Sequence, residues 1–422
     1  MRLKTSLSKP GKFFYGWRMI AVGSAIRMLG GGLHIYGFTI FFLPLSRDLG
    51  LSRAVTSLAF SLSRAQGAIE GPLAGYLIDR FGSRPIMLTA VIMSGVGYLL
   101  LSGVHSYLSF LVVYLGIITV SFTPGFMHAP MVLANTWFIR RRAITMTLIS
   151  ASVGLGGTLI APLLSMSVHS WGWRWGALLA GLSFLIVGTP LASLVHRSPE
   201  SMGLLPDGGL PYGSRDTDPS GITHSVRQTE EVVFTVTQAM RTSTFWMFVL
   251  ATLIRVGGYS TIMVHFIPIM VWKGMTEEHA AVILSIFAFL TFPAHLLVGW
   301  LADFVNKPRL MALSMLASTT ALLVLTYGQG EPSIWIFITL FTVIESIFPV
   351  TWASVGDFFG RKYFATIRGT MTFFYMWGSV AGPVVAGAVY DRTQSYAPML
   401  AALVVLFLLA TVIYALVKRP SA

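Results

Sequence analysis

The chain contains twelve segments of about 20 or more mostly apolar residues, and this feature restricts its fold more than any other. A helix needs about 20 such residues to cross the hydrocarbon core of a bilayer. Hydrophobic residues make up 55% of the 422 residues and charged residues only 11%, whereas soluble domains carry about 25% charged residues. We therefore expect an all-α polytopic membrane protein, and the composition excludes a soluble enzyme, a nucleic-acid-binding protein and a disordered scaffold. The predicted spans are 17–42, 54–78, 86–104, 107–137, 143–168, 174–195, 244–271, 278–302, 309–328, 333–356, 365–390 and 396–417.

Lysine and arginine residues are distributed unevenly among the segments that connect these spans. If both termini are cytoplasmic, 21 of the 29 basic residues lie on that side and five on the other, as the positive-inside rule requires. The net charge of +13 therefore reflects topology, and we expect no nucleic-acid partner. The first span is too long for the core of a signal peptide and is expected to be retained. We predict a monomer that crosses the cytoplasmic membrane many times, with the lipid bilayer as its surroundings.

Several kinds of chemistry are excluded by residues that the sequence lacks. There is no cysteine, so disulfides, Cys-ligated zinc and thiol catalysis are ruled out. The histidine spacing does not indicate a metal site, and no GxxxxGK[ST] segment is present for binding ATP. We therefore expect no metal and no cofactor, and any transport must be driven by a gradient.

The sequence divides into two related halves. Residues 196–243 are polar and rich in turn-forming residues, so we expect a cytoplasmic linker between a six-helix bundle at 1–195 and another at 244–422. Several residues of the first half recur in the second: Pro44, Gly50, Gly75 and Asp79 as Pro268, Gly274, Gly299 and Asp303, shifted by 224, and Gly157 and Pro162 as Gly378 and Pro383, shifted by 221. Six plus six helices with such a repeat are expected of a transporter whose halves rock about a site at the midplane.

One repeated motif carries a resemblance to a known family. The segment from Gly75 through Asp79, Arg80 and Gly82 to Arg84 resembles the loop signature between helices 2 and 3 of the major facilitator superfamily, and Gly299 to Asp303 is a reduced copy. The resemblance implies the major facilitator fold, with twelve transmembrane helices in two pseudo-symmetric six-helix bundles. It also implies a charged latch of Asp79 with Arg80 and Arg84 that keeps the inner side closed. No arginine follows Asp303 directly, so we expect a weaker ion-pair network there. The alternative is a positively charged loop with an incidental acid.

Other segments are similar to the monocarboxylate and oxalate/formate antiporter branch of that family. They are Tyr15-Gly16-Trp17, Pro44 to Ala54, Trp137 to Arg142 and the linker segment Pro199 to Gly208. Members of that branch commonly carry a basic residue in helix 8, where this chain has only His295. A basic pair on helices 1 and 7 instead resembles the organophosphate/phosphate antiporters, so the resemblance leaves the substrate open.

Five ionisable residues stand out well inside the predicted spans, because an ionisable group at the centre of a membrane helix costs about 2.5–3.5 kcal/mol. They are Arg27, Arg64, Glu70, Arg255 and Glu345. Under the shift of 224, Arg255 corresponds to position 31, one helical turn from Arg27. Glycines follow both arginines, and guanidinium groups match the oxygens of a carboxylate or phosphate in pairs. We predict that Arg27 and Arg255 bind one anionic group together; the alternative is that each forms a structural bridge with Glu70 or Glu345.

Neighbouring positions supply the remaining candidates. His34 follows Arg27 by seven residues, Tyr259 follows Arg255 by four, and Trp352 follows Glu345 by seven, so all three are predicted to contact the substrate. Glu345 is either a proton carrier or the partner of Arg255. Arg64 and Glu70 are six residues apart and are candidates for ion pairing or proton coupling with different neighbours.

These features together predict a secondary active transporter of a small organic anion, a mono- or dicarboxylate. It would work by alternating access, driven by protons or by exchange for a counter-anion. Two alternatives remain: an antiporter of organophosphate or phosphonate type, and a membrane solute sensor that does not transport. A membrane enzyme is not expected, because no loop combines a nucleophile with a base.

Overall fold

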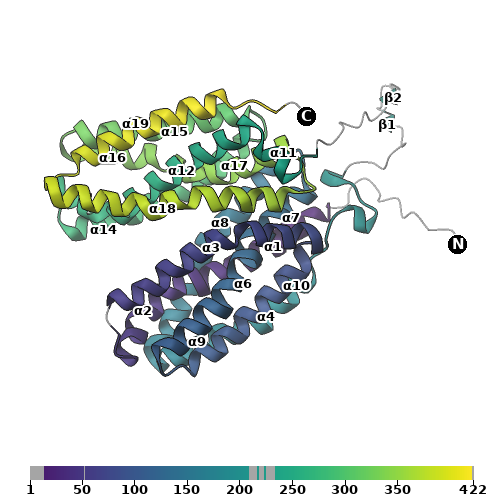
Figure 1. Ribbon diagram of the computed structural model, residues 1–422, viewed down its shortest axis with the longest axis horizontal. Helices are drawn as coiled ribbons and strands as arrows, with labels where there is room; N and C mark the ends of the chain where they lie inside the picture. Colours follow the sequence, from purple (N-terminus) through teal and green to yellow (C-terminus); the bar gives the residue numbers. More distant parts are fainter. Residues whose placement is uncertain (1–13, 52, 209–215, 218–222, 225–232, 421–422) are drawn as a thin grey trace.

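The computed structural model describes residues 14–51, 53–208, 216–217, 223–224 and 233–420, and in these ranges it contains twelve long helical segments (Figure 1). The first six are α1–η1–α2 (Gly16–Gly30, Gly31–Tyr36, Gly37–Asp48), α3 (Arg53–Phe81), α4 (Ser83–Ser102), α5–η2–α6–η3–α7 (Tyr107–Val113, Tyr114–Thr119, Val120–Phe122, Thr123–His128, Ala129–Trp137), α8 (Arg142–Trp171) and α9–η4–α10 (Trp173–Ser183, Phe184–Gly188, Thr189–Ser193). The segments η1 to η4 are π-helical turns within longer helices.

The other six segments follow a connection that contains only short elements. They are α12–α13 (Ser243–Val264, Phe266–Trp272), α14 (Glu277–Leu301), α15 (Lys307–Tyr327), α16–α17 (Gly330–Phe341, Val343–Phe359), α18 (Phe364–Thr393) and α19 (Ala397–Leu416). The connection holds the 3₁₀ turns η5 (Glu200–Met202) and η6 (Pro206–Gly208), the antiparallel pair β1 (Asp216–Thr217) and β2 (Thr223–His224), and α11 (Val236–Met240). The rest of the predicted linker, at 209–215, 218–222 and 225–232, lies outside the described residues.

The predicted all-α architecture of twelve membrane helices is confirmed. Eleven of the helical segments in the described ranges are long and apolar enough to cross a membrane. The twelfth is α3, whose hydropathy is lowered by charged residues such as Arg64, Glu70 and Asp79. Most ends lie within a few residues of the predicted ones; for example, the expected span 143–168 is α8, Arg142–Trp171.

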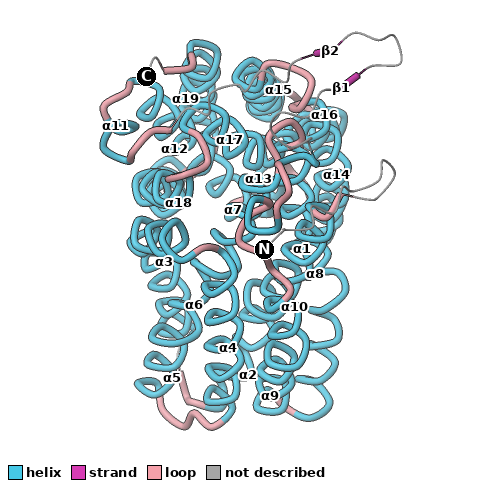
Figure 2. The backbone as a smooth tube through the Cα atoms, turned by 90° about the vertical axis from the view of Figure 1, so that its right-hand side faces the viewer, coloured by secondary structure: helices cyan, strands magenta, loops and turns pink. Residues whose placement is uncertain are grey.

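The helices form two bundles, α1 to α10 and α12 to α19 (Figures 1 and 2), which meet at one end and diverge toward the other (Figure 1). We call the end at which η5, η6 and α11 lie the linker end, and the opposite one the far end. Burial follows the same gradient. Residues 367–372 at the start of α18 are all buried, whereas Val384 and Val385 farther along are 70% and 58% exposed. The bundles are therefore in contact at the linker end.

Small residues allow α3 and α18 to cross closely in this contact. A Cβ atom added to Gly75 would lie 2.1 Å from the carbonyl oxygen of Ala365, and one added to Gly369 would lie 1.9 Å from that of Gly71. Such spacing of small residues brings membrane helices close enough for strong van der Waals packing. The linker end is therefore closed by direct backbone contact between the bundles.

Two carboxylates hold the start of a helix in the opposite bundle. Asp79, near the end of α3, accepts hydrogen bonds from the N–H groups of Ala365 and Thr366, at 3.1 and 2.8 Å, and from the Thr366 hydroxyl. Asp303, just after α14, accepts from Ala143 and Ile144 at 2.9 and 3.1 Å. We call these the two helix-start contacts.

Neither helix that receives these contacts provides a cap of its own. The residues before α18 and α8 are Tyr363 and Arg141, and neither side chain accepts a hydrogen bond from the first turn. The N–H groups at a helix start need acceptors, and the helix dipole favours a negative charge there. Each bundle therefore supplies the missing cap of a helix in the other.

Two expectations about this motif are wrong in detail. Asp79 forms no ion pair among the described residues, and Arg80 instead donates to the hydroxyl of Tyr76 at 2.9 Å. The second copy has the stronger ion-pair network, because Asp357 pairs with both Arg142 and Lys307. The reason is that helix starts, rather than arginines, attract the two motif carboxylates.

The remaining motif residues shape the connection between α3 and α4. Gly82 has a φ of +87°, a conformation that favours glycine, and it lies between the two helices. The side chain of Arg197 packs against it and donates to the carbonyl of Arg80. Arg84 lies in the first turn of α4.

A methyl group at Gly75 is expected to loosen the linker end. Gly75→Ala places a carbon where only about 2 Å is free, and overpacking of this kind costs about 1–3 kcal/mol. Because the chain has no cysteine, Thr147→Cys is a unique label site; Thr147 is buried and faces Gly299 across the other bundle contact. We expect faster maleimide labelling of Cys at this site in the Gly75→Ala background. Gly154→Ala, which has open space around it, is the control, and equal rates in the two backgrounds would contradict the role of Gly75.

Loss of the Asp79 charge is expected to loosen the same end. An asparagine keeps the size of the side chain but turns an NH₂ group toward helix N–H donors, and a charge at a helix start contributes about 1 kcal/mol. Labelling of the Thr147→Cys reporter should therefore be about fivefold faster with Asp79→Asn. Asp48→Asn is the control, because Asp48 pairs with Arg174 in the first bundle. An unchanged rate with Asp79→Asn would show that the contact does not hold the bundles together.

Candidate functional site

Arg255 and Glu345 form an ion pair within the second bundle. Arg255 on α12 is fully buried, and its Nη1 lies 3.6 Å from Oε1 of Glu345 on α17 and donates to the carbonyl of Ile344 at 3.3 Å. Its guanidinium carbon lies 5.8 Å from the centre of the Phe348 ring. Of the two roles considered for Glu345, partner of Arg255 is the one seen here. The Nε and Nη2 atoms of Arg255 have no hydrogen-bond partner among the described residues.

Tyr259 and His295 surround this ion pair. Tyr259 follows Arg255 by one turn and lies close to both Arg255 and Glu345, and also to Tyr36 of the first bundle. His295 on α14 bonds to the carbonyl of Thr291 and interacts with the same pair. Tyr259 therefore lies beside Arg255, and its predicted contact with a substrate stays a prediction. We call Arg255, Glu345, Tyr259 and His295 the Arg255 cluster.

Arg27 lies in a different group of residues, where the two bundles meet. It is 4% exposed and donates from Nη1 to the carbonyl of Met127 in η3 at 3.1 Å. Arg368 of α18, which is 3% exposed, donates to the same carbonyl at 3.0 Å. The two guanidinium groups therefore approach each other from opposite bundles.

Aromatic residues complete this second group. The guanidinium carbon of Arg368 lies 4.7 Å from the centre of the Trp352 ring, a distance typical of a cation–π contact. The rings of Trp352 and Tyr375 are 6.0 Å apart, and His128 follows Met127 directly. We call Arg27, Arg368, His128, Trp352 and Tyr375 the Arg27 cluster.

Arg27 and Arg255, which were predicted to bind one anionic group together, have different partners in the structure. The two arginines share no interaction partner among the described residues: Arg27 meets Arg368, and Arg255 meets Glu345. Trp352, predicted from its spacing to Glu345, instead contacts Arg368. The sequence thus identified residues of both clusters but not their grouping.

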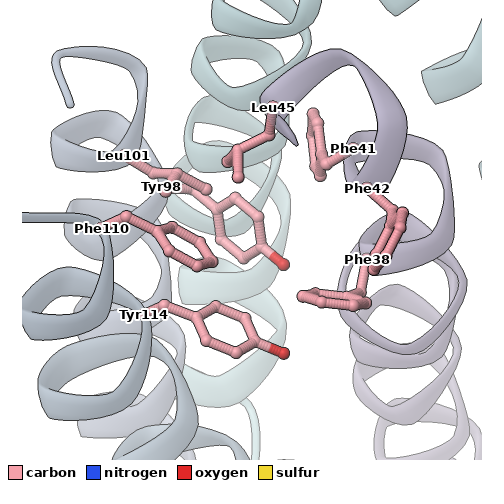
Figure 3. A pocket seen from close by; sticks show the side chains of 8 residues that line it. All are labelled: Phe38, Phe41, Phe42, Leu45, Tyr98, Leu101, Phe110 and Tyr114. Atoms are coloured by element: carbon pink, nitrogen blue, oxygen red, sulfur yellow. The ribbon is translucent and has the colours of Figure 1, made fainter. Parts of the chain in front are cut away.

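His34 is packed inside the first bundle, away from the contacts of Arg27. Its Nδ1 lies 3.2 Å from the hydroxyl of Tyr98, and its ring lies against Phe122 and Tyr114. Tyr98 and Tyr114 also line a small apolar pocket with Phe38, Phe41, Phe42, Leu45, Leu101 and Phe110 (Figure 3). The predicted role of His34 as a ligand donor is not supported by these contacts, which are those of a packing residue.

Arg64 and Glu70 on α3 both lie near the start of η2. Glu70 accepts a hydrogen bond from Gln66 at 2.6 Å, and Gln66 also donates to the carbonyl of Leu115. Arg64 lies near Tyr114. Their predicted roles in ion pairing or proton coupling stay predictions.

Arg368 is the main residue that the sequence analysis did not select. It is one of the 21 basic residues that the topology places on the cytoplasmic side, but α18 begins at Phe364, so Arg368 lies in the second turn of this helix. Arg368 follows Lys362 by six residues, and this distance was the available signal that it belongs to the helix and not to the preceding loop. The carbonyl of Met127 has no sequence signal at all. No group of three or more metal-ligating side chains occurs in the described part of the chain.

Known structures share this fold. A variant of the E. coli fucose:proton symporter FucP superposes with a TM-score of 0.75 and 13% identity, covering 96% of this chain and all of the other. The human organic anion transporter TETRAN gives a TM-score of 0.66 and 15% identity, covering 94% and 98%. At these identities the likeness concerns the fold alone.

Sequence comparison points to the same family. Human monocarboxylate transporter 11 is 26% identical over 397 residues, 90% of this chain and 78% of that protein. Monocarboxylate transporter 2 of Mesocricetus auratus is 23% identical over 403 residues, 90% and 80% of the two chains. The family model of the Major Facilitator Superfamily matches residues 20–343 and 248–422. The chain is therefore a multi-pass membrane protein that belongs to the Major Facilitator Superfamily of transporters, and it is related to the monocarboxylate transporters.

Proposed function

We propose that this protein is a secondary active transporter that moves a small organic anion, a mono- or dicarboxylate, by alternating access. The observation that carries the proposal is an excess of buried positive charge inside the protein. Arg27, Arg255 and Arg368 are all buried, and Glu345 is the single carboxylate within 4.0 Å of any of them among the described residues. Uncompensated charge in a low-dielectric interior is costly, and an anionic substrate would remove that cost.

The relatives support the same substrate class. Proteins named as monocarboxylate transporters align with 90% of the chain, and a structural neighbour is named as an organic anion transporter. A guanidinium group also matches phosphate, so an organophosphate substrate is the second candidate. A membrane sensor that binds the anion without moving it is the third.

Alternating access requires that one side be closed while the other is open. We place the linker end in the cytoplasm, as the distribution of basic residues indicates. The helix-start contacts would then close the cytoplasmic side, and the two bundles, 1–195 and 244–422 with the linker 196–243 between them, would rock to open it. The driving force is either a proton gradient or exchange for a second anion.

Counterflow in proteoliposomes tests the proposed function. Purified protein is reconstituted into vesicles loaded with an unlabelled anion, and uptake of the labelled anion is measured for pyruvate, lactate, oxalate and glycerol 3-phosphate. Transient accumulation of a carboxylate is the expected result. Accumulation of glycerol 3-phosphate alone would favour the organophosphate reading, binding without flux would favour a sensor, and neither binding nor flux with any of the four would overturn the proposal.

Glu345 is expected to be required for proton coupling if protons drive transport. Glu345→Gln removes the titratable group but keeps its size and a hydrogen-bond acceptor near Arg255. We expect it to abolish uphill accumulation driven by a pH gradient while exchange of labelled for unlabelled anion continues. Glu70→Gln is a comparison in which the altered carboxyl bonds to Gln66 instead of an arginine. Accumulation that survives in Glu345→Gln would leave Glu345 with a purely structural pairing role.

A further inference from the structure

A single carbonyl oxygen connects two arginines from different bundles. The Met127 carbonyl accepts from Nη1 of Arg27 at 3.1 Å and from Nη1 of Arg368 at 3.0 Å. The two nitrogens bonded to one oxygen cannot be more than about 6 Å apart, the two bond lengths combined. Arg27 belongs to α1 of the first bundle and Arg368 to α18 of the second. The linker end thus closes with two like charges brought together across the bundle contact.

Nothing in the described part of the chain neutralises these charges. Neither guanidinium has a carboxylate within 4.0 Å there, and both side chains are almost fully buried. The carbonyl of Met127 and that of His128, to which Arg368 also donates at 3.4 Å, supply only partial negative charges. Arg255 differs, because Glu345 already lies 3.6 Å from it. The uncompensated positive charge is therefore at Arg27 and Arg368 rather than at Arg255.

The surrounding atoms offer further hydrogen-bond donors. The Nε atoms of Arg27 and Arg368 and the Nε1 of Trp352 are buried without a partner among the described residues. The Nδ1 of His128 is also unpartnered. Buried donors of this kind are rare in folded proteins and point to a bound group that completes them. The Trp352 and Tyr375 rings provide apolar surfaces on the second-bundle side.

We propose that the carboxylate of the substrate binds between Arg27 and Arg368, in place of the Met127 carbonyl. This inference rests on the proposed function and assigns its site. One oxygen of the carboxylate would accept from each guanidinium, since forked donors suit paired oxygens. The short body of a monocarboxylate would lie against Trp352 and Tyr375. The ligand would then be held by one arginine from each bundle.

Ligand affinity of single and double variants tests this assignment. Binding of pyruvate and lactate to purified protein is measured for the wild type, Arg27→Gln, Arg368→Gln and the double variant. A charge-assisted hydrogen bond contributes about 1.5–3 kcal/mol, so each single change should weaken binding roughly tenfold to a hundredfold. The double change should cost less than the product of the two, because both side chains address one ligand group. Arg27→Lys and Arg368→Lys should restore only part of the affinity, because an ammonium lacks the forked pair of donors.

Lactamide separates a ligand contact from a structural role. It replaces the carboxylate of lactate with a neutral amide, so the wild type should strongly prefer lactate. The Gln variants should lose this preference, whereas a variant that merely loosened the bundle contact would bind both compounds more weakly and keep it. Arg174→Gln, which alters a pair with Asp48 away from the cluster, is the control and should bind as the wild type does.

The outcomes distinguish this assignment from the function itself. If folded Arg368→Gln binds lactate with unchanged affinity and preference, the assignment is overturned. If Arg255→Gln instead loses the preference while Arg368→Gln keeps it, the anion binds at Arg255 and the transport proposal stands. If the wild type binds neither pyruvate nor lactate but binds glycerol 3-phosphate, a carboxylate is the wrong substrate class, both in this assignment and in the proposed function. If the Gln variants do not fold, the Lys variants replace them: weaker binding of lactate with unchanged binding of lactamide supports the assignment, and unchanged affinity for lactate overturns it.

Discussion

The closed linker end depends on helix starts that cannot satisfy their own backbone N–H groups. The first turns of α8 and α18 lack side-chain caps, and a buried polar group left without a partner costs about 1–3 kcal/mol. Asp303 and Asp79 supply these caps from the opposite bundle. Separating the bundles at this end breaks both contacts together, because each links a helix of one rigid unit to a helix of the other. The two helix-start contacts therefore form together when the linker end closes and break together when it opens.

The spacing between glycine and aspartate in the repeated motif has a physical reason. Gly75 and Gly299 each precede the aspartate by four residues, one helical turn. Both glycines lie where an added Cβ would be 2.1 Å from the opposite bundle, at Ala365 and Thr147 respectively. The close approach at the glycine brings the next turn within reach of the facing helix start, so a short aspartate side chain can span the gap. The glycine and the aspartate of each copy therefore work together, the glycine by allowing close approach and the aspartate by capping the facing helix.

The sequence predicted the spans well because the bilayer imposes their length and polarity, but it could not predict partners set by backbone atoms. Every residue carries an N–H and a carbonyl, so neither the Asp79 contact nor the Met127 contact has a signature. His34 lies in the π-helical turn η1, with its Nδ1 3.2 Å from the hydroxyl of Tyr98. Counting residues from Arg27 could not predict this contact, because a π-helical turn changes the direction in which the following side chains point.

The two arginine clusters respond differently to rocking of the bundles. Arg255 and Glu345 both belong to the second bundle, so a rigid rotation leaves their separation of 3.6 Å unchanged; only a change of protonation or a ligand alters that pair. Arg27 keeps the Met127 carbonyl within its own bundle, whereas Arg368 reaches that carbonyl from the other bundle and must leave it when the linker end opens. The contact that changes with the conformational state is therefore the one between Arg368 and the Met127 carbonyl, whereas the ion pair of Arg255 and Glu345 is independent of it. Under the proposed function, a ligand held by Arg27 and Arg368 would respond to the conformational state, and the Arg255–Glu345 pair would not.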